Sequence, residues 1–197
     1  MKITEIELIN AQTFPKEQLG KLLAQSSPRG MLGEFTVNYL ENNNQRMFIL
    51  TDSENRIAAF ATFSVRLNGR VWQSRNAESF APYQGQSLVG KLYKMIKTDF
   101  KKSIQSDNTQ TTAGAKLWTQ ILPSLGLAPM IFDTTTEKII DPALSTIDMY
   151  PKDYDDPEIH RYTWVLEKFD NYPEQNLLIE DSLLMPYTGL WHTFTLP

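Results

Sequence analysis

The residues of this sequence that are best suited to bind a ligand lie in the turn Pro82–Leu92, with the sequence PYQGQSLVGKL. An alternating, strand-like run precedes the turn, and an amphipathic helix follows it. A turn rich in glutamine and glycine that opens a helix presents free backbone N–H groups and the positive end of the helix dipole. Such a helix start is suited to phosphate or pyrophosphate. The turn therefore predicts where a ligand binds, but not that a reaction takes place there.

Other common catalytic arrangements are missing from the sequence. There are no cysteines, which excludes thiolate catalysis, cysteine-ligated metals and disulfides. His160 follows acidic residues at positions 153, 155, 156 and 158, but their spacing lacks the glycine and the final glutamate of an EF-hand. We expect an acidic loop there and no metal site. Neither a Gly-x-Ser-x-Gly elbow nor a Walker loop is present.

Composition places the chain among ordinary globular proteins. Its 197 residues suit one domain with an appended tail, and 41% of them are hydrophobic. The net charge of −4 disfavours sequence-independent binding of nucleic acid. No apolar run is long enough to span a bilayer, and the acidic N-terminus is unlike a signal peptide. We therefore expect a cytoplasmic protein that binds neither nucleic acid nor membranes.

The hydrophobic pattern predicts mixed α and β structure. Alternation predicts strands, and apolar residues spaced three and four apart predict helices. Asn68-Gly69 predicts a tight hairpin, so the central strands form an antiparallel meander. The expected strands are Lys2–Ile9, Met47–Leu50, Ile57–Val65, Val71–Phe80, Ser103–Gln105, Pro129–Phe132 and Tyr162–Leu166. The expected helices follow Thr13, span Gly33–Glu41, start at Leu88, and run from Thr109 or Thr111 through Leu122. We expect Ser103–Gln105 to lie parallel to the strand before its helix, as in a right-handed β-α-β unit.

This order of elements, with the turn at its centre, resembles the GNAT superfamily of acyl-CoA-dependent N-acyltransferases. Tyr83-Gln84-Gly85-Gln86 resembles the start of its pyrophosphate loop, Gln/Arg-x-x-Gly-x-Gly/Ala. Asn108, followed by a helix that contains Leu117 and Trp118, resembles its second signature. The resemblance implies an α+β, three-layer fold over residues 1–169, with a mixed, mostly antiparallel sheet flanked by helices. It also implies acetyl-CoA or another acyl-CoA as the cofactor. The residues that it places at the cofactor are Phe80, Gln84, Gly85, Gln86, Ser87, Leu88, Val89 and Asn108.

Three residues acquire candidate roles from this resemblance. The backbone N–H of Phe80 could donate to the thioester oxygen. Glu78 could accept the proton of the attacking amine or order a water, although an exposed strand residue without a role is the commoner outcome. Tyr83 could donate a proton to the leaving sulfur, but a tyrosine in a turn more often packs with its hydroxyl in water.

The sequence also departs from the family pattern. Ser87 and Val89 occupy positions where the family has small residues that let the backbone approach the pyrophosphate. We expect Val89 to obstruct this site in part and to weaken the binding of coenzyme A. Trp118 replaces the tyrosine that often protonates the leaving thiolate, and an indole is not a usable acid.

Two functions therefore stay open. One is an acyl-CoA-binding protein that transfers an acetyl group to an unidentified small-molecule or protein amine. The other is a catalytically silent GNAT-fold interaction or assembly module, such as a phage structural or accessory protein. The acidic loop Asp153–Glu158 suits a cationic amine such as a polyamine. The tail at 170–197 is too apolar for disorder, and we expect it to pack on the domain, on another copy of the chain or on an assembly partner.

Overall fold

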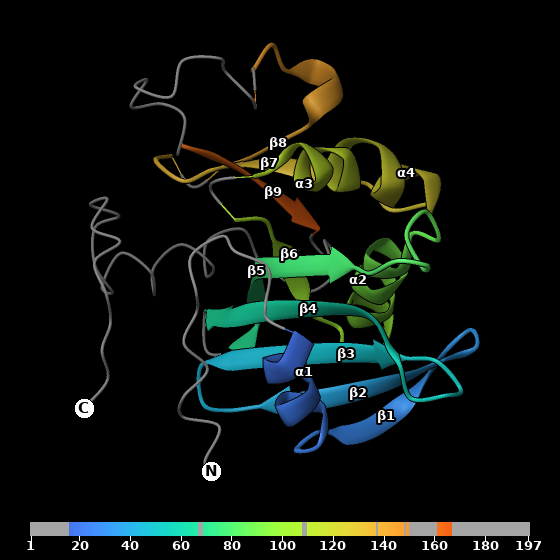
Figure 1. Ribbon diagram of the computed structural model, residues 1–197. Helices are drawn as coiled ribbons and strands as arrows, with labels where there is room; N and C mark the ends of the chain where they lie inside the picture. Colours follow the sequence, from blue (N-terminus) through green and yellow to red (C-terminus); the bar gives the residue numbers. More distant parts are fainter. Residues whose placement is uncertain are drawn as a thin grey trace.

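The structure of this chain is a computed structural model that describes residues 16–66, 69–107, 110–136, 138–147, 149 and 161–166 (Figure 1). Several expectations lie outside these residues. They are the strand Lys2–Ile9, the helix cap at Thr13, the acidic loop Asp153–Glu158, the domain boundary at 169 and the packing of the tail.

The described strands form one mixed sheet in the order β1-β2-β3-β4-β5-β6-β9-β7-β8. All neighbours are antiparallel except β5 and β6, which are parallel. This sheet, with helices on its two faces, confirms the expected α+β class (Figure 1). The strands are β1 Ser27–Leu32, β2 Phe35–Glu41, β3 Gln45–Thr51, β4 Ile57–Arg66, β5 Val71–Ser79, β6 Ser103–Gln105, β7 Met130–Asp133, β8 Lys138–Ile140 and β9 Tyr162–Leu166.

The expected β-α-β unit is present at the centre of the sheet. Strand β5 leads through the predicted turn into helix α2, Leu88–Asp99, and the chain returns as β6 parallel to β5. Residues Val71–Gln73 pair with Ser103–Gln105, and beyond these pairs β5 continues alone on that side. The unit therefore places the start of α2 beside an uncovered length of β5.

The expectation of a helix over Gly33–Glu41 is wrong, because this segment contains the strand β2. The spacing of its apolar residues fits both the 3.6-residue period of a helix and the two-residue period of a strand. In the structure Val37 and Tyr39 face one side of the sheet and Leu40 faces the other, which is the alternation of a strand. Pairing with β1 and β3 buries the strand on both faces and decides in its favour. The meander accordingly has two more strands than the sequence predicts.

Helices cover both faces of the sheet (Figure 1). Helix α1, Lys16–Leu23, buries Leu19 and Leu22 against Ile49 and Phe60 on one face. Helix α2 buries its apolar stripe on the opposite face. A second helical run covers the same cluster. It comprises α3 Thr112–Lys116, a π-helical turn Leu117–Ile121 (η3) and α4 Leu122–Ser124. Elsewhere in the chain, a 3-10 turn Pro142–Leu144 (η4) follows β8.

Two predictions for the second helical run are confirmed. Thr111 caps α3 by accepting a hydrogen bond from the N–H of Gly114. Gly126, with a positive φ of 77°, follows the run, and the N–H of Leu127 reaches back to the carbonyl of Leu122. This is the way in which many helices end at a glycine.

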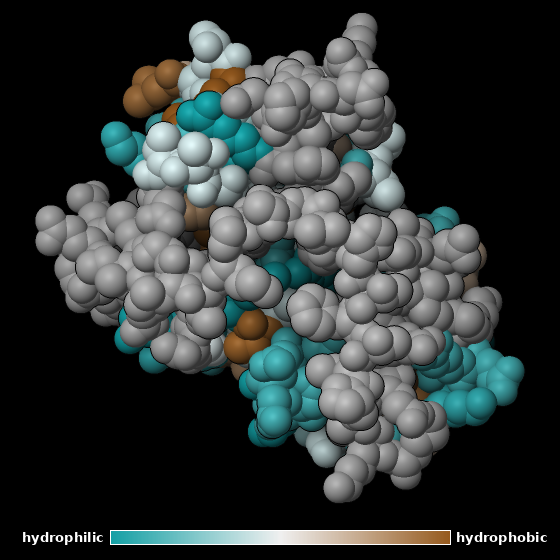
Figure 2. Space-filling model, turned by 90° about the vertical axis from the view of Figure 1, so that its left-hand side faces the viewer, coloured by the Kyte–Doolittle hydropathy of each residue, from teal (hydrophilic) through white to brown (hydrophobic). Residues whose placement is uncertain are grey.

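Exposed apolar side chains are scattered over the described surface. Met31 and Leu144 are the large hydrophobic residues that are mostly exposed there. Figure 2 shows that the coloured atoms on the lower half of one face are largely teal, with brown atoms in small separate groups. Single exposed residues of this kind are usual on a folded domain. No helix in the described part of the chain is long and apolar enough to cross a bilayer.

Candidate ligand site at the start of helix α2

The first turn of α2 has free backbone donors. Ser87 is the N-cap in a left-handed conformation, φ 55° and ψ 32°, and its side chain makes no capping hydrogen bond. The N–H of Lys91 is the first to bond back along the helix, to the carbonyl of Ser87 at 2.9 Å. The N–H groups of Leu88, Val89 and Gly90 therefore have no carbonyl one turn earlier to bond to. No acidic side chain lies in this turn, which leaves it suited to an anion.

In the turn before α2, the side chain of Tyr83 is held by a hydrogen bond, whereas the three residues that follow it are exposed to solvent. The hydroxyl of Tyr83 donates to the carboxylate of Asp52, which lies in the turn between β3 and β4 and also pairs with Arg56 at 2.7 Å. Gln84, Gly85 and Gln86 are exposed, and Gly85 has a φ of 85° that favours glycine. The N–H of Gln86 donates to the carbonyl of Tyr83 at 3.4 Å, so the turn holds a defined shape while its residues 84–86 are exposed to solvent.

Tyr83 is poorly suited to the expected role of proton donor to sulfur. The hydrogen bond to Asp52 raises the pKa of the Tyr83 hydroxyl, and the same bond is the main reason why the pKa of Asp52 is well below its usual range. A phenol whose proton is held by a carboxylate gives that proton up less readily than a free one. The structure therefore assigns Tyr83 to holding the turn in place.

Val89 packs inward, contrary to the expectation that it obstructs the site. Its side chain is half-buried and contacts the core cluster that contains Leu88 and Leu92. The next residue, Gly90, faces the second helical run so closely that a Cβ atom there would lie 2.7 Å from Cγ2 of Ile121. This glycine allows the close approach of two helices, and Val89 shares the same packed side of α2.

The backbone N–H groups at the free edge of β5 belong to other residues than Phe80, the donor expected from the sequence. The N–H of Phe80 donates to the carbonyl of Ala58 at 2.9 Å, so it is not available to a thioester oxygen. In an antiparallel pair, residues alternate between facing the partner strand and facing away from it. Because Ala77 and Ser79 alternate with Phe80, their N–H groups face away from β4, along the edge that β6 leaves uncovered.

Glu78 lies between Ala77 and Ser79 in the sequence. Its side chain points to one face of the sheet, whereas their N–H groups point along the strand edge. Glu78 pairs with Phe60 of β4, whose ring belongs to the cluster covered by α1, so the side chain of Glu78 points to that face. The carboxylate is half-buried and makes no hydrogen bond or ion pair with the residues that the structure describes.

The space beyond the β5–β6 pairs contains a polar cluster that the motifs did not reveal. Arg75 sits at a bulge of β5, with only 8% of its side chain exposed, and pairs with Asp107 at 3.2 Å. The buried hydroxyls of Ser74 and Tyr93 are hydrogen-bonded to each other beside it. The sequence signal was the polar run Gln73–Asn76 in the middle of a predicted strand.

Two further residues from the second family signature are Trp118 and Asn108. Trp118 is buried in the core with its ring edge against Tyr93, at a centroid distance of 5.9 Å, so it packs and does not face solvent. Asn108 lies outside the described residues. Within the described ranges, no three histidine or acidic residues come together in a way that could hold a metal ion.

Comparison with known proteins gives similarity to solved structures alone. No protein-family model matches the sequence, and no curated protein matches it. A spermidine N-acetyltransferase chimera from Vibrio cholerae and hSSAT is 10% identical, with a TM-score of 0.38 over 78% of this chain and 90% of that one. The ribosomal-protein-S18-alanine N-acetyltransferase of Escherichia coli is 16% identical, with a TM-score of 0.37 over 83% and 85%. Both of these structures are named as N-acetyltransferases.

Proposed function

We propose that this chain binds an acyl-CoA at the start of α2 and transfers the acyl group to an amine. The observation that carries the proposal is the position of the uncapped first turn of α2 directly after the uncovered edge of β5. The free N–H groups of the first turn of α2 suit an anionic pyrophosphate, and the uncovered edge of β5 suits an extended chain that ends in a thioester.

The residues present fit such a ligand. Gln84, Gly85 and Gln86 are exposed to solvent, and the N–H groups of Leu88 and Val89 would hold phosphate oxygens. The inward packing of Val89 leaves space in front of these donors. When bound, an acyl-CoA supplies a thioester carbonyl that an amine can attack.

The chain itself would supply one or two donors and a base. The N–H groups of Ala77 and Ser79 would donate to the acyl oxygen and stabilise the charge that develops on it. Glu78 would accept the proton that the amine loses as its nitrogen bonds to the acyl carbon and the carbon–sulfur bond breaks. The sulfur would leave as a thiolate and take a proton from solvent, because Tyr83 is engaged by Asp52.

Calorimetry with coenzyme A on a matched pair of N-cap variants tests the binding site. Ser87→Asp puts a carboxylate at the free donors of α2, so we expect coenzyme A to bind at least about tenfold more weakly. The control is Thr111→Asp, which makes the same change at the cap of α3 and should leave binding unchanged. Equal binding by the wild-type protein and Ser87→Asp would refute this site.

The second candidate is a silent GNAT-fold module. It is favoured because a buried Trp118 stands where the family often has an acidic tyrosine, and because the other candidate acid, Tyr83, is bound to Asp52. Acetyl transfer to a panel of amines, including polyamines and lysine peptides, separates the two functions. An acyltransferase should lose about 10²- to 10⁴-fold of its rate in Glu78→Gln while keeping its affinity for coenzyme A. Binding of coenzyme A without transfer to any amine would favour the silent module.

A further inference from the structure

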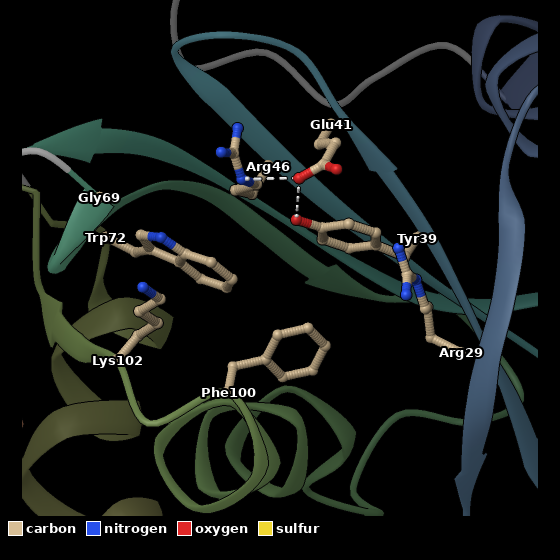
Figure 3. A pocket seen from close by; sticks show the side chains of 8 residues that line it. All are labelled: Arg29, Tyr39, Glu41, Arg46, Gly69, Trp72, Phe100 and Lys102. Atoms are coloured by element: carbon tan, nitrogen blue, oxygen red, sulfur yellow. Dashed lines mark hydrogen bonds and ion pairs between the residues drawn. The ribbon is translucent and has the colours of Figure 1, made fainter.

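A pocket lies at the far end of α2 from the proposed acyl-CoA site (Figure 3). Its walls come from β1, β2, β3, the start of β5 and the chain just after α2, and it has a volume of about 330 Å³. The helix is 12 residues long, so its two ends are about 18 Å apart. The lining residues are Arg29, Tyr39, Glu41, Arg46, Gly69, Trp72, Phe100 and Lys102.

Aromatic rings make up the apolar part of this pocket. Tyr39 and Trp72 stand on opposite sides, and Phe100 lies between them with ring centroids 5.8 Å and 5.7 Å away (Figure 3). Tyr39 and Trp72 are nearly fully buried, and all three rings pack on the buried Phe48. Because Tyr39 and Trp72 are nearly fully buried, the half-buried Phe100 is the ring with the most exposed surface, and the packing of the three rings makes this lining rigid.

Cationic groups surround these rings. The guanidinium of Arg29 lies over Tyr39 at 5.3 Å, and Arg46 and Lys102 line other sides of the hollow. Glu41 is the one carboxylate in the lining; it pairs with Arg46 at 3.3 Å and accepts the hydroxyl of Tyr39 at 2.8 Å. Lys102 makes no hydrogen bond or ion pair with any residue that the structure describes. The pocket is therefore positively charged, although the whole chain carries −4.

We propose that this pocket binds a planar aromatic ring that carries an anionic group. The ring of Phe100, with the small exposed parts of Tyr39 and Trp72, would contact the ring of the ligand, and Lys102 and Arg29 would bind its anion. The volume lies at the lower end of that of small-molecule sites, so it suits a ligand no larger than a mononucleotide. A phosphate on a nucleotide and a carboxylate on a simple aromatic acid share this chemistry.

Titration of glycine-labelled protein by NMR tests both parts of the ligand. The amide of Gly69 reports on this pocket, and the amide of Gly85 reports on the turn before α2. We expect AMP, indole-3-acetate or both to shift Gly69 without shifting Gly85, and the tighter of the two identifies the source of the anion. Adenosine and inorganic phosphate, which each lack one part, should bind at least about tenfold more weakly. No shift of Gly69 with either anionic ligand up to about 10 mM, or equal binding of adenosine and AMP, would overturn the proposal.

A charge-reversal pair locates the anion. Lys102→Glu should weaken the tighter ligand at least about tenfold, because it removes an attractive charge and adds a repulsive one. Lys138→Glu makes the same change on β8, at the other edge of the sheet, and should leave the affinity unchanged. Equal loss in both variants, or none in Lys102→Glu, would overturn the proposal. Neither lysine belongs to the buried core, so both variants are expected to fold.

Discussion

The hydroxyl of Tyr83 donates a hydrogen bond to the carboxylate of Asp52, and this bond joins the turn before α2 to the turn between β3 and β4. The edge of the Tyr83 ring also packs on Phe35, at a centroid distance of 5.7 Å. A residue that the family resemblance suggested as a catalytic acid is therefore a structural link between two turns of the sheet.

Removing this hydroxyl should lower stability and leave catalysis largely intact. We expect Tyr83→Phe to lower the melting temperature while any acyl-transfer rate stays within about threefold of wild type, since a true general acid is worth about 10²- to 10⁴-fold. Asp52→Asn serves as the partner variant. Because both substitutions break one bond, the double variant should be less destabilised than the sum of the two single variants. A hundredfold loss of rate at an unchanged melting temperature would restore Tyr83 as the acid.

Replacing Val89 by glycine should not tighten coenzyme A binding. The valine packs against the core, so its removal leaves the free N–H groups of the first turn as they were. We expect an affinity within about twofold of wild type and a loss of about 1 kcal/mol in stability from the added chain flexibility. Isothermal calorimetry and urea unfolding measure the two quantities. Tightening by tenfold or more would show that the side chain does obstruct the site.

Gly90 should be intolerant of even one methyl group. A Cβ at this position would lie 2.7 Å from Ile121 and 3.0 Å from Leu125, so Gly90→Ala should destabilise the protein by about 1 kcal/mol in spite of the better helix propensity of alanine. In an Ile121→Ala background the clash is relieved, and the same substitution should become neutral or stabilising. Chemical denaturation of the four proteins of this cycle provides the measurement.

Stability should fall at low pH, in part through Asp133. Burial alone would raise the pKa of this carboxyl, but hydrogen bonds from Arg161 and Thr136 outweigh it and hold the pKa well below the usual range. A group whose pKa is depressed by folding stabilises the native state above its unfolded pKa, near 4, and loses that contribution as the pH falls toward the folded value.

Asp133→Asn tests this dependence. We expect it to cost about 3 kcal/mol at pH 7, because the buried carboxylate of Asp133 loses the charge that attracts the partly exposed guanidinium of Arg161. The difference from wild type should shrink as the pH is lowered from 5 to 2. Asp99→Asn, at an exposed position, should show no such change. A difference that is constant with pH would contradict the assigned ion pair.

The sequence predicted the centre of this fold better than its margins. The β5–α2–β6 unit was predictable, because turn residues and apolar spacing there agree. The segment 35–41 was not predictable, since both strand alternation and helical spacing fit its apolar residues. Only pairing with the neighbouring strands decides that it is a strand. Strand β1 gave no signal: Pro28, Arg29 and Gly30 are exposed, and only pairing with β2 makes the segment a strand.

The site was predictable in place but not in detail. A glycine-containing turn before an amphipathic helix located the free donors of α2. The bond between Tyr83 and Asp52 joins residues 31 positions apart, and the pair Arg75–Asp107 joins residues 32 apart, so neither appears as a local pattern. The orientation of the Phe80 N–H depends on the register between β4 and β5, which the sequence does not show.

The late pairing of β6 imposes an order on assembly. Strands β1 to β5 are successive neighbours along the chain, so each can pair soon after it is synthesised. Strand β6 has β9 as its second neighbour, and Ile104 pairs with Leu166 from a much later segment. A nascent chain that ends before residue 162 would expose one edge of β6 and one edge of β7. During translation, therefore, the half of the sheet next to the proposed acyl-CoA site is the half most open to mispairing with another chain.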